Sequence, residues 1–226
     1  MQQPLLRQPA PSSDRRPEGQ LPRPPSDTSL WDAMGLAAWV GHLADRPKLC
    51  NFGHMTNFET DLAAIIGHPS TQRPFVCNGS PSASNIWIVG YNAATTGGDW
   101  WRFWSSGAGF NFTAWRKEYD AERAARGKSS SATRLRIDRI TAAIPDILET
   151  NIYATPSTEM ANMPVSTTDA FDLLLETFKP RVIVAHGVPA AKHLQDWSGG
   201  KLITCPHLSR AGYSVVDKVI EQLLAN

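Results

Sequence analysis

The sequence predicts an α/β fold: a three-layer α/β/α sandwich with a four-stranded parallel sheet. Short apolar runs alternate with longer segments of helical spacing, a pattern typical of parallel strands joined by helices. The runs are apolar along their whole length, as in Val182-Ile183-Val184-Ala185, which indicates strands buried on both faces. Polar residues follow the expected strands at one edge, where open sheets of this kind bind ligands.

The elements can be placed in order along the chain. Thr28 or Ser29 can cap a first helix that runs to about residue 44, and a second helix covers 58–66. A loop dense in Pro, Ser, Gly and Asn spans 69–84. Strands are expected at 85–89, 147–153, 181–185 and 201–204. Helical segments are expected at 99–105, 111–126, 132–143, 167–178, 188–196 and 212–224.

The composition separates a leader from one domain. Residues 1–27 hold seven prolines and few apolar side chains, so we expect a disordered leader followed by a single domain at 28–226. The leader lacks the apolar run of a signal peptide, and no stretch of about 18 apolar residues suggests a membrane span. A cytoplasmic, monomeric protein without a membrane partner is therefore expected.

Charge and cysteine content exclude several classes of site. Cys50, Cys77 and Cys205 are widely spaced with no C-x-x-C pair, so neither a metal site nor a disulfide framework is expected, and no cofactor motif occurs. The formal net charge of +1 is not that of a strongly basic DNA-binding domain. Eight basic and four acidic residues fall within 116–139, which fits either two solvated helix faces or a strip of phosphate contacts.

Four polar residues lie at or near the ends of the four expected strands: Asn92, Asn151, His186 and His207. Each has an ordinary explanation, because Asn favours turns and caps and many histidines are structural. An amide cannot act as a base at neutral pH, so a catalytic Asn92 would hold and orient a water. A buried Asn151 would need hydrogen-bond partners, which a bound ligand can supply.

Aromatic residues are concentrated directly after the first strand, between Trp100 and Trp115. The spacing of Trp100, Phe103 and Trp104 is that of a buried helical stripe, so most of these rings should belong to the core. One or two near the loop, Trp100 first, could stack on a planar base.

Two segments carry a family resemblance, Gly90-Tyr91-Asn92-Ala93-Ala94 and Pro206-His207-Leu208-Ser209-Arg210. With Asn151 between them, their order resembles the uracil-DNA glycosylase superfamily, in particular its mismatch-type and single-strand-selective branches. Those branches read Gly-x-Asn-Pro-Gly at the first segment, so Ala93 and Ala94 depart from the pattern. The late segment is shortened, and either His207 or only its Leu-Ser-Arg part corresponds to the family motif.

The resemblance implies a DNA repair enzyme that hydrolyses the glycosidic bond of uracil or a related damaged base flipped out of DNA. Asn92 would hold the water, His207 would donate an N–H to the departing base, and Asn151 would read the base edge. Trp100 would stack on the base. Leu208 or Arg210 would fill the gap in the DNA. The neighbouring residues of both segments would complete the base site: Gly90, Tyr91, Ala94 and Ser209.

Two rival interpretations remain. A catalytically weak or inactive nucleic-acid-binding module on the same fold is favoured by Ala93, Ala94 and the shortened late segment. A small-molecule enzyme would use His186 and His207 on a nucleoside or nucleotide, although the sequence has neither G-x-G-x-x-G nor a Walker loop. The resemblance also bears on selectivity. Family members that exclude thymine have a bulky side chain two positions after the catalytic acid or amide, and Ala94 stands at that position here, which implies that a substituent at position 5 of the base fits.

Overall fold

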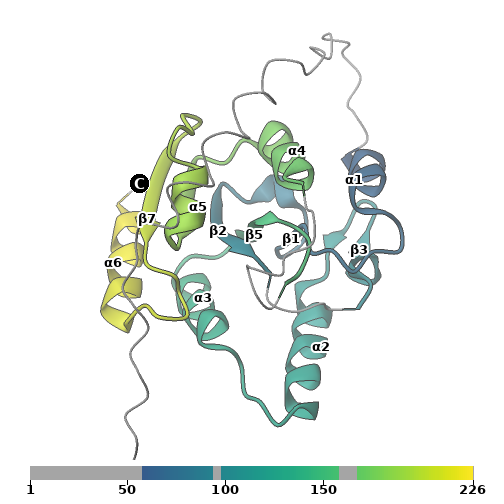
Figure 1. Ribbon diagram of the computed structural model, residues 1–226, viewed down its shortest axis with the longest axis horizontal. Coiled ribbons are helices and arrows are strands. Elements are labelled where there is room, and N and C mark those ends of the chain that lie inside the picture. Colours follow the sequence, from purple (N-terminus) through teal and green to yellow (C-terminus); the bar gives the residue numbers. More distant parts are fainter. Residues whose placement is uncertain (1–57, 94–97, 158–166, 226) are drawn as a thin grey trace, which may run out of the picture. The chain divides into compact units, whose positions relative to one another are not determined.

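A mostly parallel sheet of five strands organises the mixed α/β structure, a computed structural model that describes residues 58–93, 98–157 and 167–225. The strands are β1 (Phe75–Val76), β2 (Ile86–Asn92), β5 (Ile147–Tyr153), β6 (Val182–His186) and β7 (Lys201–Cys205). Their order is β1-β5-β2-β6-β7, with β1 antiparallel to β5 and the other four parallel (Figure 1). The carboxyl ends of the four parallel strands therefore share one edge.

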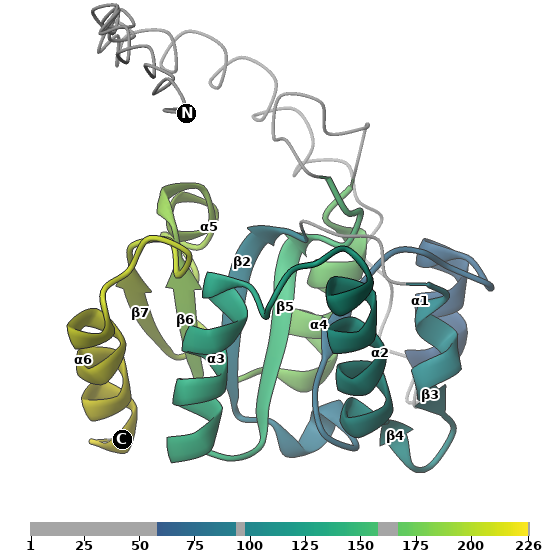
Figure 2. The same cartoon turned by 90° about the horizontal axis from the view of Figure 1, so that it is seen from below.

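Helices lie on both faces of this sheet (Figure 2). They are α1 (Phe58–Ile66), α2 (Phe112–Ala125), α3 (Ala132–Ala143), α4 (Asp169–Phe178), α5 (Val188–His193) and α6 (Tyr213–Leu224). One apolar core joins α1, α4 and α5 to the sheet, and a second core joins α3 and α6 to the opposite face. No helix in the described part of the chain combines the length and apolar character needed to cross a membrane.

Strand β2 explains why the sequence shows continuous apolar runs. Trp87 and Val89 enter the core beside α4 and α5, whereas Ile88 enters the core beside α3 and α6. Successive side chains of a strand point to opposite faces, so a strand covered on both sides must be apolar at every position. The same argument accounts for β6, where all five residues are buried.

Side-chain caps set where the two helices nearest the candidate site begin. Asn111 Oδ1 accepts a hydrogen bond from the Ala114 N–H at 3.0 Å, at the start of α2. Ser131 Oγ accepts one from the Arg134 N–H at 3.1 Å, at the start of α3. Such caps satisfy N–H groups that have no partner within the helix.

The structure corrects the expected strand count from four to five. The additional strand, β1, lies within the segment 69–84 that was expected to be a loop. The first parallel strand also runs to Asn92, beyond the expected end at residue 89. The segment 99–105 contains the 3₁₀ helix η3 (Trp100–Phe103) and the short strand β3 (Trp104–Ser105), which pairs with β4 (Gly109–Phe110).

Two of the expectations lie outside the described residues. These are the disordered leader at 1–27 and the helix from Thr28 or Ser29 to about residue 44. The expected helix at 58–66 is confirmed as α1.

Candidate active site

A cavity of about 180 Å³ lies at the carboxyl edge of the parallel strands. Its walls include the four polar residues that the sequence places at or near strand ends: Asn92, Asn151, His186 and His207. For comparison, an apolar cavity of about 150 Å³ binds benzene. The cavity therefore has room for a single six-membered ring.

Gly90 creates the space in which two of these side chains meet. It pairs with Asn151 across the β2–β5 ladder. A Cβ at residue 90 would lie 2.6 Å from Asn151 Oδ1 and 2.9 Å from His186 Nε2, closer than non-bonded atoms approach. Because Gly90 has no side chain, the amide of one neighbouring strand and the imidazole of the other converge over β2.

Asn151 is buried without a hydrogen-bond partner for its amide. The residue is 8% exposed, and its side chain forms no hydrogen bond with any described residue. The amide is not among the fully buried unsatisfied groups of the described residues, so it is accessible from the cavity. Since Asn151 lines the cavity, a bound molecule can supply the missing donor and acceptor.

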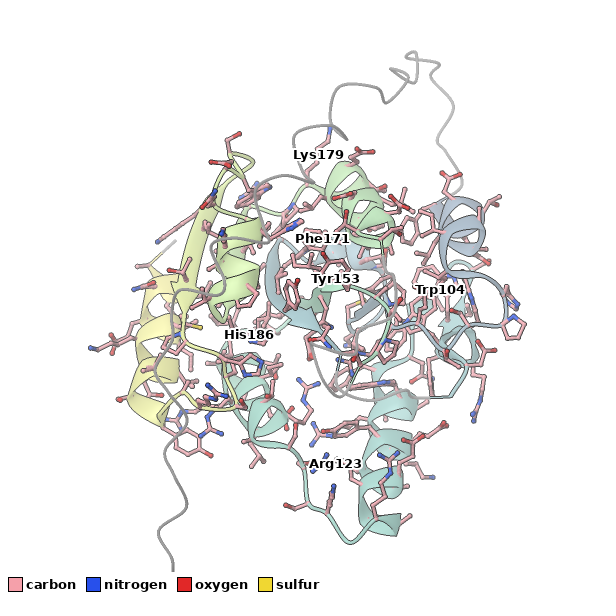
Figure 3. The ribbon with its side chains drawn as sticks, in the orientation of Figure 1. Trp104, Arg123, Tyr153, Phe171, Lys179 and His186 are labelled. Carbon is pink, nitrogen blue, oxygen red and sulfur yellow. The ribbon has the colours of Figure 1, made fainter. Side chains whose placement is uncertain are left out.

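His186 is also buried and only partly satisfied. It is 6% exposed, and its Nδ1 has no hydrogen-bond partner among the described residues. Burial, with a smaller contribution from His207, lowers its pKa from 6.5 to about 3. His186 therefore stays neutral at physiological pH. Figure 3 shows it between β2 and α3, on the side of the sheet that also carries Arg123.

His207 packs against His186 and has a defined tautomer. The two ring centroids are 4.9 Å apart with an interplanar angle of 78°. Its Nδ1 accepts a hydrogen bond from the Ser209 N–H at 3.2 Å and lies 2.7 Å from Ser209 Oγ. Because Nδ1 is an acceptor, the proton of the neutral ring is on Nε2. Desolvation, and then the charge of Arg210, lower the pKa of His207, so the ring is a neutral N–H donor.

Asn92 is held in place by one of its own amide hydrogens. Its Nδ2 donates to the carbonyl oxygen of Ser157 at 2.9 Å, after the end of β5. The backbone is fixed at the same place, because the Ser157 N–H donates to the Ala93 carbonyl at 2.8 Å. This contact orients the side chain, whose Oδ1 accepts no hydrogen bond from the described residues and can accept one from water.

Two of the expected site residues belong to the core instead. Trp100 is 3% exposed, its indole N–H donates to the Phe75 carbonyl at 2.8 Å, and its ring stacks with Trp104 and Phe110. It has no free face for a base, so its expected stacking role was wrong. Leu208 is 0% exposed within the core formed by α3 and α6, and it was wrong as a candidate for filling a gap in DNA.

The other residues expected at the base site lie outside the cavity wall or outside the described residues. Tyr91 packs edge-on against Tyr153, with ring centroids 5.1 Å apart, and does not line the cavity. Ser209 and Arg210 are exposed in the loop that carries His207. Ala94 lies outside the described residues, so the space beside position 5 of a base has no structural description.

Most of the basic residues within 116–139 have partners inside the protein. Arg116 forms ion pairs with Asp120 at 2.8 Å and Asp138 at 2.7 Å. The other paired arginines are Arg126 with Glu122, Arg134 with Glu149, and Arg139 with Asp217. These contacts leave fewer free cations on α2 and α3 than the sequence suggests.

Sequence reasoning missed several residues in the walls of the cavity. Arg73, Tyr119 and Glu149 line it, as does Arg123 from α2. Arg73 and Glu149 reach it from the β1 end of the sheet, and no sequence pattern marks them. The sequence did single out Arg123, but only as one of eight basic residues.

A second and larger cavity, of about 540 Å³, lies away from this edge. Its walls include Glu59, His68 and Trp101, and none of the candidate residues. Among the described residues, no group of three or more His, Cys, Asp or Glu side chains is arranged to hold a metal ion. The cavity at the strand ends is therefore the place where the candidate residues gather.

No protein-family model matches the chain, and no curated protein matches it. We therefore infer function from the side chains that line the cavity.

Proposed function

We propose that this protein is a uracil-DNA glycosylase-like enzyme, which hydrolyses the glycosidic bond of uracil or a related damaged base flipped out of DNA. The single observation that carries the proposal is the cavity of about 180 Å³ lined by Asn92, Asn151, His186 and His207. It combines space for one pyrimidine ring with an unpaired buried amide, a neutral imidazole N–H and an anchored carboxamide. The family resemblance of the sequence and the arrangement of helices on both faces of the sheet, as in a three-layer sandwich, agree with this proposal.

Each side chain has a role that follows from its geometry. Asn151, buried and unpaired, reads the edge of the base through its amide, which both donates and accepts hydrogen bonds. His207 Nε2–H donates to a base oxygen as negative charge develops there. Asn92 Oδ1 accepts a hydrogen bond from the attacking water, because its Nδ2 is held by Ser157.

No pair of carboxylates is needed for this reaction. Ordinary glycosidases use an acid to protonate an alkoxide leaving group. The departing pyrimidine is instead an acidic imide whose anion is stabilised by hydrogen-bond donors. Among the described residues, Glu149 is the one carboxylate in the cavity wall, and it is bound by both terminal nitrogens of Arg134.

The proposal is tested by incubating the protein with a uracil-containing oligonucleotide and then cleaving any abasic sites with alkali. Wild type should create abasic sites, and Asn92→Ala and His207→Ala should each slow the reaction by about 100-fold or more, by analogy with the loss of an oxyanion-hole donor. Asn111→Ala is the matched control, because this exposed asparagine caps α2 outside the cavity. An abasic product that is insensitive to both cavity substitutions would reject the site.

A nucleic-acid-binding module without activity is the second candidate, favoured by Ala93, which is 1% exposed and hydrogen-bonded to Ser157 where the family has proline. It predicts DNA binding that weakens steeply with salt, with no abasic product at any enzyme concentration. Fluorescence anisotropy with the same oligonucleotide, measured at two salt concentrations, separates the two functions.

A further inference from the structure

Arg73 is a charged residue of the cavity that none of the roles above uses. It follows α1 and precedes β1, and its backbone N–H donates to the Ala154 carbonyl at 2.8 Å. Its side chain lines the cavity together with Asn151 and His186. The guanidinium forms no hydrogen bond or ion pair with any described residue.

Glu149 lines the same cavity as Arg73, but its carboxylate is already bound by Arg134. Its Oε2 accepts a hydrogen bond from Arg134 Nη1 at 2.8 Å, and its Oε1 accepts one from Arg134 Nη2 at 2.6 Å. This is the paired geometry in which arginine binds a carboxylate most strongly. Arg134 therefore occupies both oxygens of Glu149, and Arg73 has no ion-pair partner among the described residues.

The cavity wall consequently carries net positive charge. Within the described parts of the chain, Arg73 is unpaired, and Arg123 donates only to the neutral carbonyl of Ser129. Burial lowers the pKa of Arg73, an effect that the charge of Glu149 partly opposes, yet a guanidinium stays protonated in proteins. Arg73 is partly buried, and an anion in the cavity would give its guanidinium a charged partner.

We infer that Arg73 binds the negative charge of a pyrimidine anion in this cavity and so acts as a further catalytic residue. The inference rests on the proposed function, because the anion is the base that leaves the sugar. In that step, the C1′–N1 bond breaks and its electron pair stays on the base. Water forms the new bond to C1′ and releases one proton to solvent, and the base anion takes up a proton after it leaves.

Arg73 and His207 would act differently on this anion. His207 offers one N–H from a neutral ring, whereas Arg73 offers several N–H groups and a full positive charge. Charge-assisted hydrogen bonds are roughly twice as strong as neutral ones. The contribution of Arg73 should therefore grow as the departing base becomes a poorer leaving group.

The first test compares departing bases of different acidity. Arg73→Met, which keeps length and removes charge, should slow uracil release by about 100-fold. 5-Fluorouracil is a more acidic base, so the factor by which Arg73→Met slows its release should be at least about tenfold smaller than the factor for uracil. Arg73→Lys, which keeps the charge, should recover part of the lost rate. Arg181→Met is the control, because Arg181 is exposed at the opposite edge of the sheet. Equal slowing of both bases, or none, would overturn the inference.

The second test measures binding without catalysis, by calorimetry with two free pyrimidines. Barbiturate is an anion at neutral pH and uracil is neutral. Wild type should bind barbiturate at least about tenfold more tightly than uracil, and Arg73→Met should lose that preference while keeping the wild-type unfolding transition. A wild type that prefers barbiturate but forms no abasic product would reject the glycosylase and support anion binding by Arg73. A preference unchanged in Arg73→Met would overturn the inference.

Discussion

Gly90 controls the approach of the two buried polar side chains in the cavity. Any side chain at this position would occupy the space in which Asn151 and His186 lie, at 2.6 Å and 2.9 Å from a Cβ. The backbone itself needs no glycine, because Gly90 is not among the residues with positive φ. The constraint is therefore steric, and it acts on the site.

Gly90→Ala should displace Asn151 and His186 and lower base release by at least about tenfold, with a stability loss of about 1–3 kcal/mol from overpacking. Single-turnover kinetics and urea unfolding measure the two effects. Gly212→Ala is the control, because a Cβ there meets only Ser214 Oγ, at 3.8 Å. A variant with wild-type activity would contradict the convergence of these side chains.

Leu208 should affect stability and not the choice of DNA. It is fully buried, so Leu208→Ala should lower the free energy of unfolding by about 2–5 kcal/mol. The ratio of activity on single-stranded DNA to activity on duplex DNA, per folded molecule, should then equal that of the wild type. Val188→Ala, at a position that is 79% exposed, should change stability little. A loss of activity confined to duplex DNA would instead support the expectation that Leu208 fills the gap in the DNA.

His186 should make the fold sensitive to mild acid. Its pKa is about 3 in the folded protein and 6.5 as a free group, so the unfolded chain takes up the proton first. The free energy of unfolding should therefore fall from about pH 6.5 downward, by up to about 1.4 kcal/mol per pH unit from this residue. Urea unfolding between about pH 7 and pH 5 measures the slope, before most carboxylates titrate. The slope should flatten in His186→Asn, and an unchanged slope would refute the assignment.

At the level of elements, Arg134 links α3 to β5 under the cavity. Its side chain is 5% exposed and binds both oxygens of Glu149, with Asp138 3.0 Å from its Nε. The guanidinium also lies 5.6 Å from the centre of the Trp115 ring in α2. One cation thus contacts α2, α3 and the sheet, in addition to the apolar cores that hold these helices.

Arg134→Met should destabilise the protein by about 3–5 kcal/mol, because it leaves Glu149, whose side chain is only 13% exposed, without its partner. The double variant Arg134→Met/Glu149→Leu should regain much of that loss, since both charges are removed together. Urea unfolding of the wild type, Arg134→Met, Glu149→Leu and the double variant gives the free energies of a double-mutant cycle. Arg126→Met, in an exposed pair with Glu122, should have little effect. Additive losses in the double variant would show that the pair is not coupled.

The elements differ in how well sequence alone could predict them. The four parallel strands were placed because burial on both faces demands apolar runs such as Val182–Ala185. Strand β1 was missed because it has only two residues, too few to show a period. The spacing of Trp100 indicated a buried stripe but not whether one face stayed free, and the structure shows both the burial and the rings that cause it.

For the whole molecule, the site depends on contacts between distant segments. The sequence could predict Asn92, Asn151 and His207 as candidates, because strand ends of a parallel sheet converge. It could not predict Arg73, whose importance depends on Arg134 engaging Glu149 and leaving Arg73 unpaired. Pairing of this kind is set by three-dimensional proximity, which no local pattern encodes.

A crystal structure with an oligonucleotide that contains 2′-fluoro-2′-deoxyuridine is the most direct test. The fluorine disfavours positive charge on the sugar, so the glycosidic bond should survive in the complex. We predict that the uracil ring occupies the cavity, hydrogen-bonded to Asn151, with His207 Nε2 and Arg73 facing its oxygens. A uracil that stays stacked in the DNA, or that binds elsewhere while this cavity remains unoccupied by it, would contradict the account.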